Sequence, residues 1–173
     1  MAASQGSDLM NQTSLTLDGD RGMRIERVFN APPRIVYEAI TKPELVRRWW
    51  APKSLGVTVV SCEADVRVGG KYRYVFSARG GPHMAFSGTY SEVKANSRLV
   101  NTEFFEPTAG GVQPGDQPAI VTVTLEDLGG KTRLVSHSLY ASKEVRDMVL
   151  ATGMETGMRE SYDQLDELVE SLN

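Results

Sequence analysis

Two short predicted helices follow directly on one predicted strand, and this order constrains the fold more than any other feature of the sequence. The alternation over residues 22–29 predicts the strand. A helix then opens near Pro33 and runs to about Ile40, because proline is tolerated in a first helical turn. A second short helix reaches Trp49, and Pro52 prevents its continuation. Consecutive short helices at this point of a chain are unusual.

From Val57 onward the pattern predicts strands joined by tight turns, and therefore one antiparallel sheet. Strict alternation over residues 71–77 places Tyr72, Tyr74 and Phe76 on one face. Residues 107–118 are rich in proline and glycine, and this composition predicts a long loop. Seven strands are expected, over residues 22–29, 57–67, 71–77, 83–94, 99–106, 119–126 and 132–140.

The last element is predicted to be one long helix. Apolar residues keep a helical period for about thirty residues from Ser142, a length of ~45 Å, which suffices to cross the sheet. Gly153 and Gly157 lie within it, and each costs about 1 kcal/mol of helix propensity. A close backbone approach, or room for a ligand, would offset that cost.

Length and charge narrow the class of protein. A chain of 173 residues suits one domain with its own core, which we assign to residues 19–173 after a flexible tail over residues 1–18. The 19 basic residues are scattered among 22 acidic ones, so a nucleic-acid partner is not expected. No run approaches the ~20 apolar residues of a membrane span. A single cysteine, Cys62, and a terminus without signal-peptide features predict a cytoplasmic protein.

Six short motifs, each weak alone, occur in a specific order. They are Trp49-Trp50-x-Pro52, Asp65-x-Arg67-x-Gly69-Gly70, Phe86-x-Gly88-x-Tyr90, Arg98-Leu99-Val100, Val121-Thr122-Val123-Thr124-Leu125 and Gly153-Met154-x-x-x-Gly157-Met158. Together with the order of elements they resemble the helix-grip, or START-like (SRPBCC), superfamily. Within it the chain is most similar to the family of homologues of the activator of the heat-shock ATPase (AHSA-type), over residues 22–172.

The resemblance implies an α+β fold in which a curved antiparallel sheet grips the long C-terminal helix and leaves a cavity between them. Such cavities take apolar or amphipathic small molecules. Members of the superfamily bind lipids, hormones or polyketides, and some catalyse cyclisation or dehydration. The sequence contains no dinucleotide or Walker fingerprint and no histidine or cysteine spacing typical of a zinc site, so neither a cofactor nor a metal is expected.

The candidate ligand-binding residues are mostly aromatic or sulfur-containing. Tyrosine places a polar hydroxyl in an apolar wall, and methionine adapts to irregular ligands, although both also fill ordinary cores. Of the two adjacent tryptophans, one is expected to anchor the short helix and the other to stand at the pocket mouth. The candidates are Trp50, Tyr72, Tyr74, Phe76, Phe86, Phe104, Met154, Met158 and Tyr162.

Two residues are candidates for acid–base chemistry. His137 would serve if it faced the cavity, although a hydrogen-bonded strand histidine is the simpler interpretation. Glu103 would have a raised pKa if buried and would then serve as a general acid. No G-x-S-x-G hydrolase motif is present.

Three functions remain open on this evidence. The first is a non-catalytic protein that carries or sequesters an apolar small molecule. The second is a cyclase-like or dehydratase-like enzyme that uses the same cavity. The third is an interaction protein that modulates a chaperone or another ATPase through its surface, and a homodimer is compatible with all three.

Overall fold

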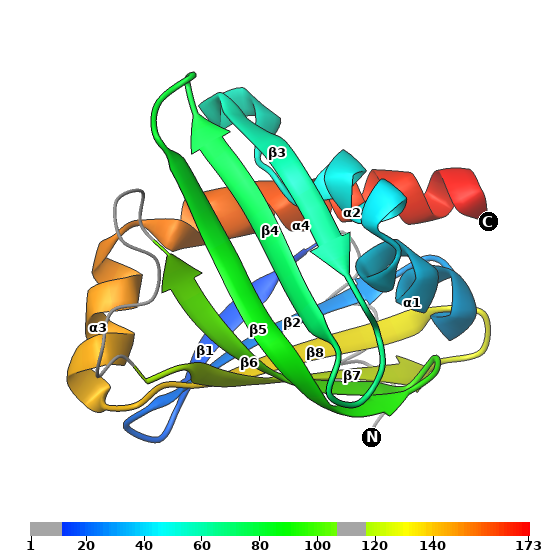
Figure 1. Cartoon of the computed structure of the whole chain (residues 1–173). Helices are drawn as coiled ribbons and strands as arrows, with labels where there is room; N and C mark the ends of the chain where they lie inside the picture. The colour runs from blue at the N-terminus through cyan, green and yellow to red at the C-terminus, as the bar shows by residue number, and fades with distance from the viewer. Residues whose placement is uncertain (1–11, 107–116) are drawn as a thin grey trace.

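A curved antiparallel sheet wraps around the C-terminal helix (Figure 1), which is the α+β helix-grip architecture expected from the sequence. The computed structural model describes residues 12–106 and 117–173. The predicted loop at 107–118 therefore falls largely outside the described residues. In chain order the elements are β1 (Ser14–Asp18), β2 (Gly22–Phe29), α1 (Pro33–Thr41), α2 (Pro43–Trp49), the 3-10 turn η1 (Lys53–Leu55), β3 (Val57–Ala64), β4 (Lys71–Ala78), β5 (His83–Lys94), β6 (Arg98–Glu106), β7 (Ala119–Asp127), β8 (Thr132–Leu139), α3 (Lys143–Ala151) and α4 (Met154–Leu172).

The strands form a single sheet in the order β1-β2-β8-β7-β6-β5-β4-β3. Every neighbouring pair is antiparallel, and the pairing of β2 with β8 joins the two ends of the chain. Register shifts interrupt β3 between Val59 and Ser61 and β5 between Tyr90 and Glu92. Bulges of this kind bend a strand and increase its twist, so they contribute to the curvature that closes the sheet around α4.

The described residues form eight strands, so the prediction of seven was wrong by one. Strand β1 pairs with β2 from Ser14 opposite Glu26 to Asp18 opposite Gly22. It lies at the sheet edge, where a short and weakly apolar segment is stabilised by the backbone of its neighbour. The predicted tail therefore ended too late, since residues 14–18 belong to the sheet. Residues 1–11 of that tail lie outside the described residues.

The predicted single C-terminal helix is two helices, α3 and α4, with a change of direction between them (Figure 1). The start at Ser142 is confirmed, because its side chain accepts a hydrogen bond from the backbone N–H of Val145 at 3.2 Å. Gly153 separates the helices in a left-handed conformation with φ 78° and ψ 20°. A residue in that conformation ends one helix and permits a new direction for the next.

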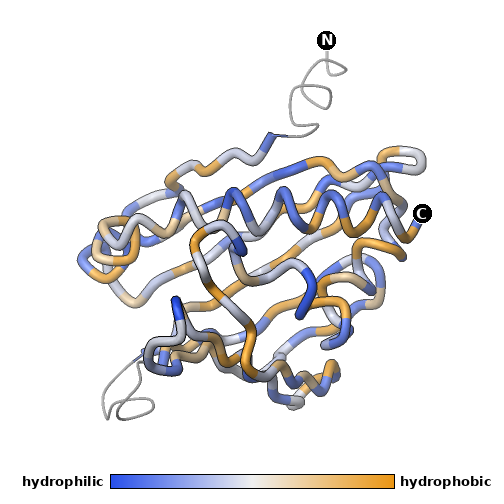
Figure 2. The backbone as a smooth tube through the Cα atoms, turned by 90° about the horizontal axis from the view of Figure 1, so that it is seen from above, coloured by the Kyte–Doolittle hydropathy of each residue, from blue (hydrophilic) through white to orange (hydrophobic). Residues whose placement is uncertain are grey.

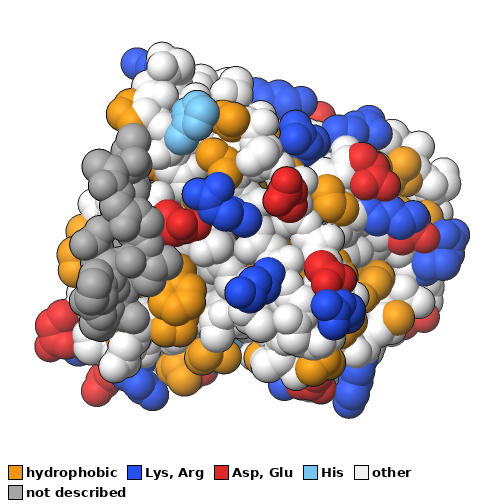
Figure 3. All heavy atoms as spheres, viewed as in Figure 1, with side chains coloured by type: hydrophobic (Ala, Val, Ile, Leu, Met, Phe, Trp, Pro, Cys, Tyr) orange, Lys and Arg blue, Asp and Glu red, His pale blue; other side chains and the backbone are white. Residues whose placement is uncertain are grey.

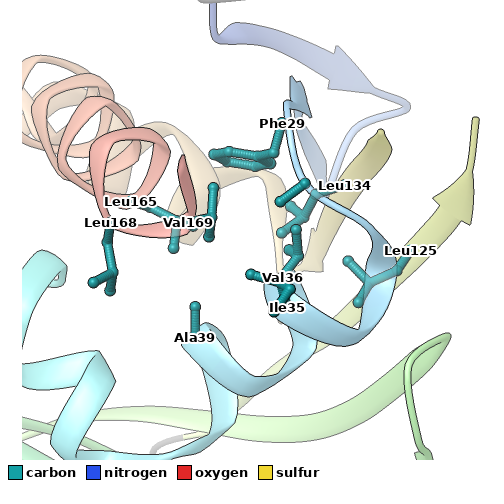
Figure 4. Packing of buried hydrophobic residues seen from close by; sticks show 10 residues of the cluster. Phe29, Ile35, Val36, Ala39, Leu125, Leu134, Leu165, Leu168 and Val169 are labelled. Carbon is teal, nitrogen blue, oxygen red and sulfur yellow. The ribbon is translucent and has the colours of Figure 1, made fainter. Parts of the chain in front are cut away.

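The main core lies between the second half of α4, the helix α1 and the strands β2, β7 and β8 (Figure 4). Phe29, Val36, Leu165 and Val169 are completely buried there. Trp49 packs against the same cluster and donates its indole N–H to the carbonyl of Ala39 at 2.9 Å. Helix α4 is thus fixed to the sheet mainly through its C-terminal half.

A buried arginine adds a polar link between the sheet and α4. Arg27 on β2 is 2% exposed and contacts Asp163 at 2.6 Å and Asp166 at 3.1 Å, both on α4. It also donates to the hydroxyl of Thr13 at 3.1 Å. Removing one partner of a buried ion pair leaves the other charge without compensation, so this contact resists any shift of α4 along the sheet.

The described surface carries charged side chains of both signs and also exposed apolar ones, such as Val68 and Phe105. Hydrophobic and hydrophilic residues alternate along the strands and the long helix (Figure 2). Over β3, β4 and β5, basic and acidic side chains lie side by side (Figure 3). In the loop that joins β3 to β4, Arg67 and Asp65 form an ion pair at 2.7 Å. Among the described helices, none has the length and apolar character needed to cross a membrane.

The two helix glycines provide a matched pair of substitutions. We expect Gly153→Ala to lower the free energy of unfolding by about 1–2 kcal/mol, because an alanine in the left-handed region is strained. Gly157 is helical, and an added methyl group would meet Pro52 at 3.4 Å, an ordinary contact. Gly157→Ala should therefore be neutral or stabilising by up to about 1 kcal/mol. Urea denaturation measures the free energy of unfolding of both variants. Equal losses in the two would contradict a left-handed conformation at Gly153 alone.

Candidate ligand-binding cavity

A cavity of about 460 Å³ lies between the concave face of the sheet, the helix α2 and the first half of α4. Its walls come from residues far apart in the sequence, from Met23 on β2 to Leu165 on α4. The core described above closes the space at one end of α4. At the other end, Met154 and Met158 face the sheet across the cavity.

One side of the cavity is an aromatic cluster formed by Trp50, Tyr74, Phe76 and Phe86. The Trp50 ring makes edge contacts with the other three rings, with centroids 5.1–5.8 Å apart. Phe76 and Phe86 stack at 5.7 Å on the neighbouring strands β4 and β5. This cluster offers a large apolar and polarisable surface to a ligand.

Tyr72 extends this wall because Gly88 leaves room for its ring. The two residues are register partners on β4 and β5. A methyl group at position 88 would lie 2.8 Å from the Tyr72 ring and 1.8 Å from the Thr102 carbonyl oxygen, so only glycine fits. The Tyr72 hydroxyl donates to that carbonyl at 2.9 Å and accepts from the Asn101 amide at 3.1 Å.

A second part of the cavity wall carries polar side chains, which we call the polar group: Glu103, Ser136, Ser138, Tyr140 and Tyr162. Glu103 lies on β6, the serines alternate along β8, and Tyr162 projects from α4. The phenols interact with the serines, Tyr140 with Ser138 and Tyr162 with Ser136. The cavity wall is therefore aromatic over β4 and β5, whereas Glu103 and the two serines lie on β6 and β8, on either side of the apolar Val121 and Val123 of β7.

Burial shifts the pKa values in this polar group. Desolvation raises the pKa of the Glu103 carboxyl to about 7. Burial also raises the pKa values of Tyr140 and Tyr162 to about 12, and the nearby Glu103 charge contributes to both. At neutral pH the phenols are therefore protonated donors, while Glu103 exchanges its proton in the physiological range.

Most of the predicted ligand-binding residues and one of the two acid–base candidates lie in the cavity wall. The adjacent tryptophans both contribute, and Trp49 is also the one that anchors α2. The predicted residues that line the cavity are Trp50, Tyr72, Tyr74, Phe76, Phe86, Met154, Met158, Tyr162 and Glu103.

Two predicted site residues lie on the wrong face of their strands. His137 alternates with the lining residues Ser136 and Ser138, so it points away from the cavity, and its Nε2 lies 2.9 Å from a carboxylate oxygen of Asp18. Phe104 likewise follows Glu103 and does not line the cavity. The period of two in a strand explains both errors, because neighbouring residues must face opposite sides.

The sequence interpretation missed several wall residues. Tyr140 directly follows β8 and shares a face with Leu134, Ser136 and Ser138. Asn101 lies on the Glu103 face of β6. The period-two pattern linking Leu99, Asn101 and Glu103 was available, but Val100 and Thr102 on the other face made it ambiguous which face of the strand lines the cavity.

Among the described residues, no group of histidine, cysteine, aspartate and glutamate is arranged to hold a metal ion.

The raised pKa of Glu103 predicts a pH-dependent stability. As the pH rises from about 4.5 to 7, the unfolded chain releases this proton while the folded protein retains it, so the stability contributed by the protonated group is lost. Glu103→Gln lacks this loss. We expect the difference in unfolding free energy, variant minus wild type, to grow by on the order of 2–3 kcal/mol between pH 4 and pH 8. Urea denaturation at several pH values measures it, and a constant difference would refute a raised pKa.

Comparison with known proteins gives a consistent family and fold. The family model described as "Activator of Hsp90 ATPase homolog 1-like protein" matches residues 30–170. The crystal structure of a Rhodobacter sphaeroides protein is 26% identical with a TM-score of 0.81, and the match covers 92% of this chain and 99% of that one. A solution structure from Arthrobacter aurescens is 26% identical with a TM-score of 0.79, covering 91% of each chain.

A crystal structure from Chromobacterium violaceum is 30% identical with a TM-score of 0.68, and the match covers 86% of this chain and 97% of that chain. No curated protein matches the sequence. Folds of this type commonly serve as ligand-binding or chaperone-modulating scaffolds. The family match, the fold and the cavity agree, and the chain belongs to the family of activator of Hsp90 ATPase homolog 1-like proteins.

Proposed function

We propose that the protein binds an apolar or amphipathic small molecule in the cavity between the sheet and α4. The observation that carries the proposal is the division of one cavity into an aromatic side and a polar side. A volume of about 460 Å³ falls within the range of roughly 300–1,000 Å³ that is typical of small-molecule sites. A ligand with an apolar body and one polar end matches both sides at once.

A neutral fluorescent dye, N-phenyl-1-naphthylamine, tests occupancy of the cavity. Met158 lines the cavity on α4, so Met158→Trp should fill part of it and weaken dye binding by roughly tenfold or more. Met148 on α3 is 63% exposed, and Met148→Trp makes the same substitution outside the cavity. Dye fluorescence titrations should therefore show a loss of affinity only in the first variant, and equal affinities would contradict binding in the cavity.

Native mass spectrometry of the purified protein identifies a natural ligand. We expect a bound species that denaturation releases as a small apolar or amphipathic compound. Met158→Trp purified in parallel should carry less of that compound, whereas Met148→Trp should carry the wild-type amount. A compound retained equally by both variants would indicate binding outside the cavity.

The position of Glu103 favours acid–base catalysis as a second candidate function. A carboxyl whose pKa is about 7 both accepts and donates a proton near neutral pH, which is the property needed in a general acid or base. The phenols of Tyr140 and Tyr162 lie close enough for their pKa values to respond to its charge. A cyclase-like or dehydratase-like reaction would use these groups.

Incubation of the protein with its co-purified compound tests this second function. An enzyme should convert the compound, and Glu103→Gln should slow the conversion by about 10²–10⁴-fold, the usual contribution of a general acid or base. Recovery of the unchanged compound would contradict the enzymatic function and support a carrier function. Conversion at an unchanged rate by Glu103→Gln would exclude this residue from the chemistry.

The remaining predictions concern location and surface partners. The only cysteine of the chain is a buried free thiol, which supports a reducing compartment and a cytoplasmic location. A large exposed apolar patch or a matching loop at 107–118 would favour a chaperone-modulating role, and most of this loop lies outside the described residues. That role and a homodimer stay predictions.

A further inference from the structure

The charge of the cavity wall carries information about its ligand. Among the described residues that line the cavity, Glu103 is the only one with an acidic carboxyl or a basic side chain. No lysine, arginine or histidine belongs to this part of the wall. No ion pair to Glu103 occurs among the described residues either, although acidic residues elsewhere, such as Asp166 and Glu106, pair with arginine.

The groups around Glu103 come from three different elements, and all of them are neutral. The titratable side chains that face it in the described structure are the phenols of Tyr72 on β4, Tyr140 after β8 and Tyr162 on α4. The Tyr72 hydroxyl already donates to the Thr102 carbonyl, and the other two phenols interact with serines. These phenols therefore make the surroundings of Glu103 polar, but they do not neutralise the charge of its carboxylate.

A positively charged hydrogen-bond donor is the ligand group that best stabilises a carboxylate with no ion-pair partner in the cavity wall. Hydrogen bonds between an ammonium group and a carboxylate are roughly twice as strong as neutral ones. Two carboxylates sharing a site repel each other, and one of them must then take up a proton. An alcohol lies between these cases, because it donates a hydrogen bond but brings no charge.

Resting on the proposed function, we infer that the cavity selects apolar ligands that carry a basic nitrogen and disfavours ligands that carry a carboxylate. The apolar body lies against Trp50, Phe76 and Phe86, and the nitrogen lies beside Glu103. Both groups belong to the wall of the same cavity. The ligand class is thus an amphipathic amine.

Three probes of matched size test this inference, namely 4-phenylbutylamine, 4-phenylbutanol and 4-phenylbutanoate. Isothermal titration calorimetry at pH 8 should rank the amine about tenfold or more above the alcohol and the carboxylate last. Glu103→Gln should remove the advantage of the amine over the alcohol, and an unchanged circular dichroism spectrum shows that the variant is folded. Glu106→Gln is the matched control, since it removes an acid of the same strand that pairs with Arg73 outside the cavity.

The dependence of binding on pH provides an independent measurement. The raised pKa of about 7 means that Glu103 is mostly protonated at pH 6 and mostly ionised at pH 8. An ammonium ligand stabilises the ionised form, so its affinity should rise about tenfold between these pH values, while the amine itself stays protonated. The affinity for the alcohol should rise much less than the affinity for the amine, and both rises should vanish in Glu103→Gln.

The outcomes separate the inference from the proposed function. Equal affinities for the three probes, or a preference for the carboxylate, would overturn the selection of amines and retain a binding cavity. An amine preference that survives in Glu103→Gln would overturn the role of this residue. The absence of binding by all three probes, together with no binding of the naphthylamine dye, would overturn the proposed function and the inference with it. Failure of the three probes while the dye still binds would overturn the inference alone.

Discussion

The attachment of α4 to the sheet through its C-terminal half is the constraint on which the rest of the structure depends. Leu165, Leu168 and Val169 pack against β2, β7, β8 and α1, and Arg27 links the same part of the helix to β2. A straight helix cannot follow a curved sheet along its whole length. Its first half therefore stands away from β4 and β5, and the cavity occupies the space between them. Gly153 makes this placement possible, since α3 leaves in a different direction.

The cavity is divided by the order of strands in the sheet. Strands β4 and β5 provide the aromatic cluster, while β6 and β8 provide Glu103 and the two serines. Each of these side chains has the same simple origin, an inward position in an alternating strand. What distinguishes Glu103 is its setting among neutral phenols, where burial disfavours the charged carboxylate and raises its pKa. A carrier and an acid–base catalyst would both use this arrangement, and the identity of the bound compound decides between them.

The aromatic strand over residues 71–77 shows how far alternation alone predicts a site. Tyr72, Tyr74 and Phe76 were placed on one face, and all three line the cavity. On β6 the same rule was insufficient, because both faces carry apolar and polar residues and only one of Glu103 and Phe104 could point inward. On β8 the inward face carries serines, so its pattern resembles an exposed surface, and alternation alone did not exclude His137 from the cavity. A residue on an amphipathic strand is placed by the packing of its neighbours, which single-sequence patterns do not contain.

The sequence by itself determined the class of fold, the order of helices and strands and the aromatic character of the cavity, because these follow from local periodicity and from residues such as Pro52 that forbid alternatives. The tertiary structure decided the eighth strand, the break at Gly153, and which side of β6 and β8 faces α4. Each of these depends on contacts between distant segments: β1 is held by β2, Gly153 takes its left-handed conformation where α3 and α4 diverge, and Glu103 meets Tyr140 and Tyr162 only after the sheet closes around the helix.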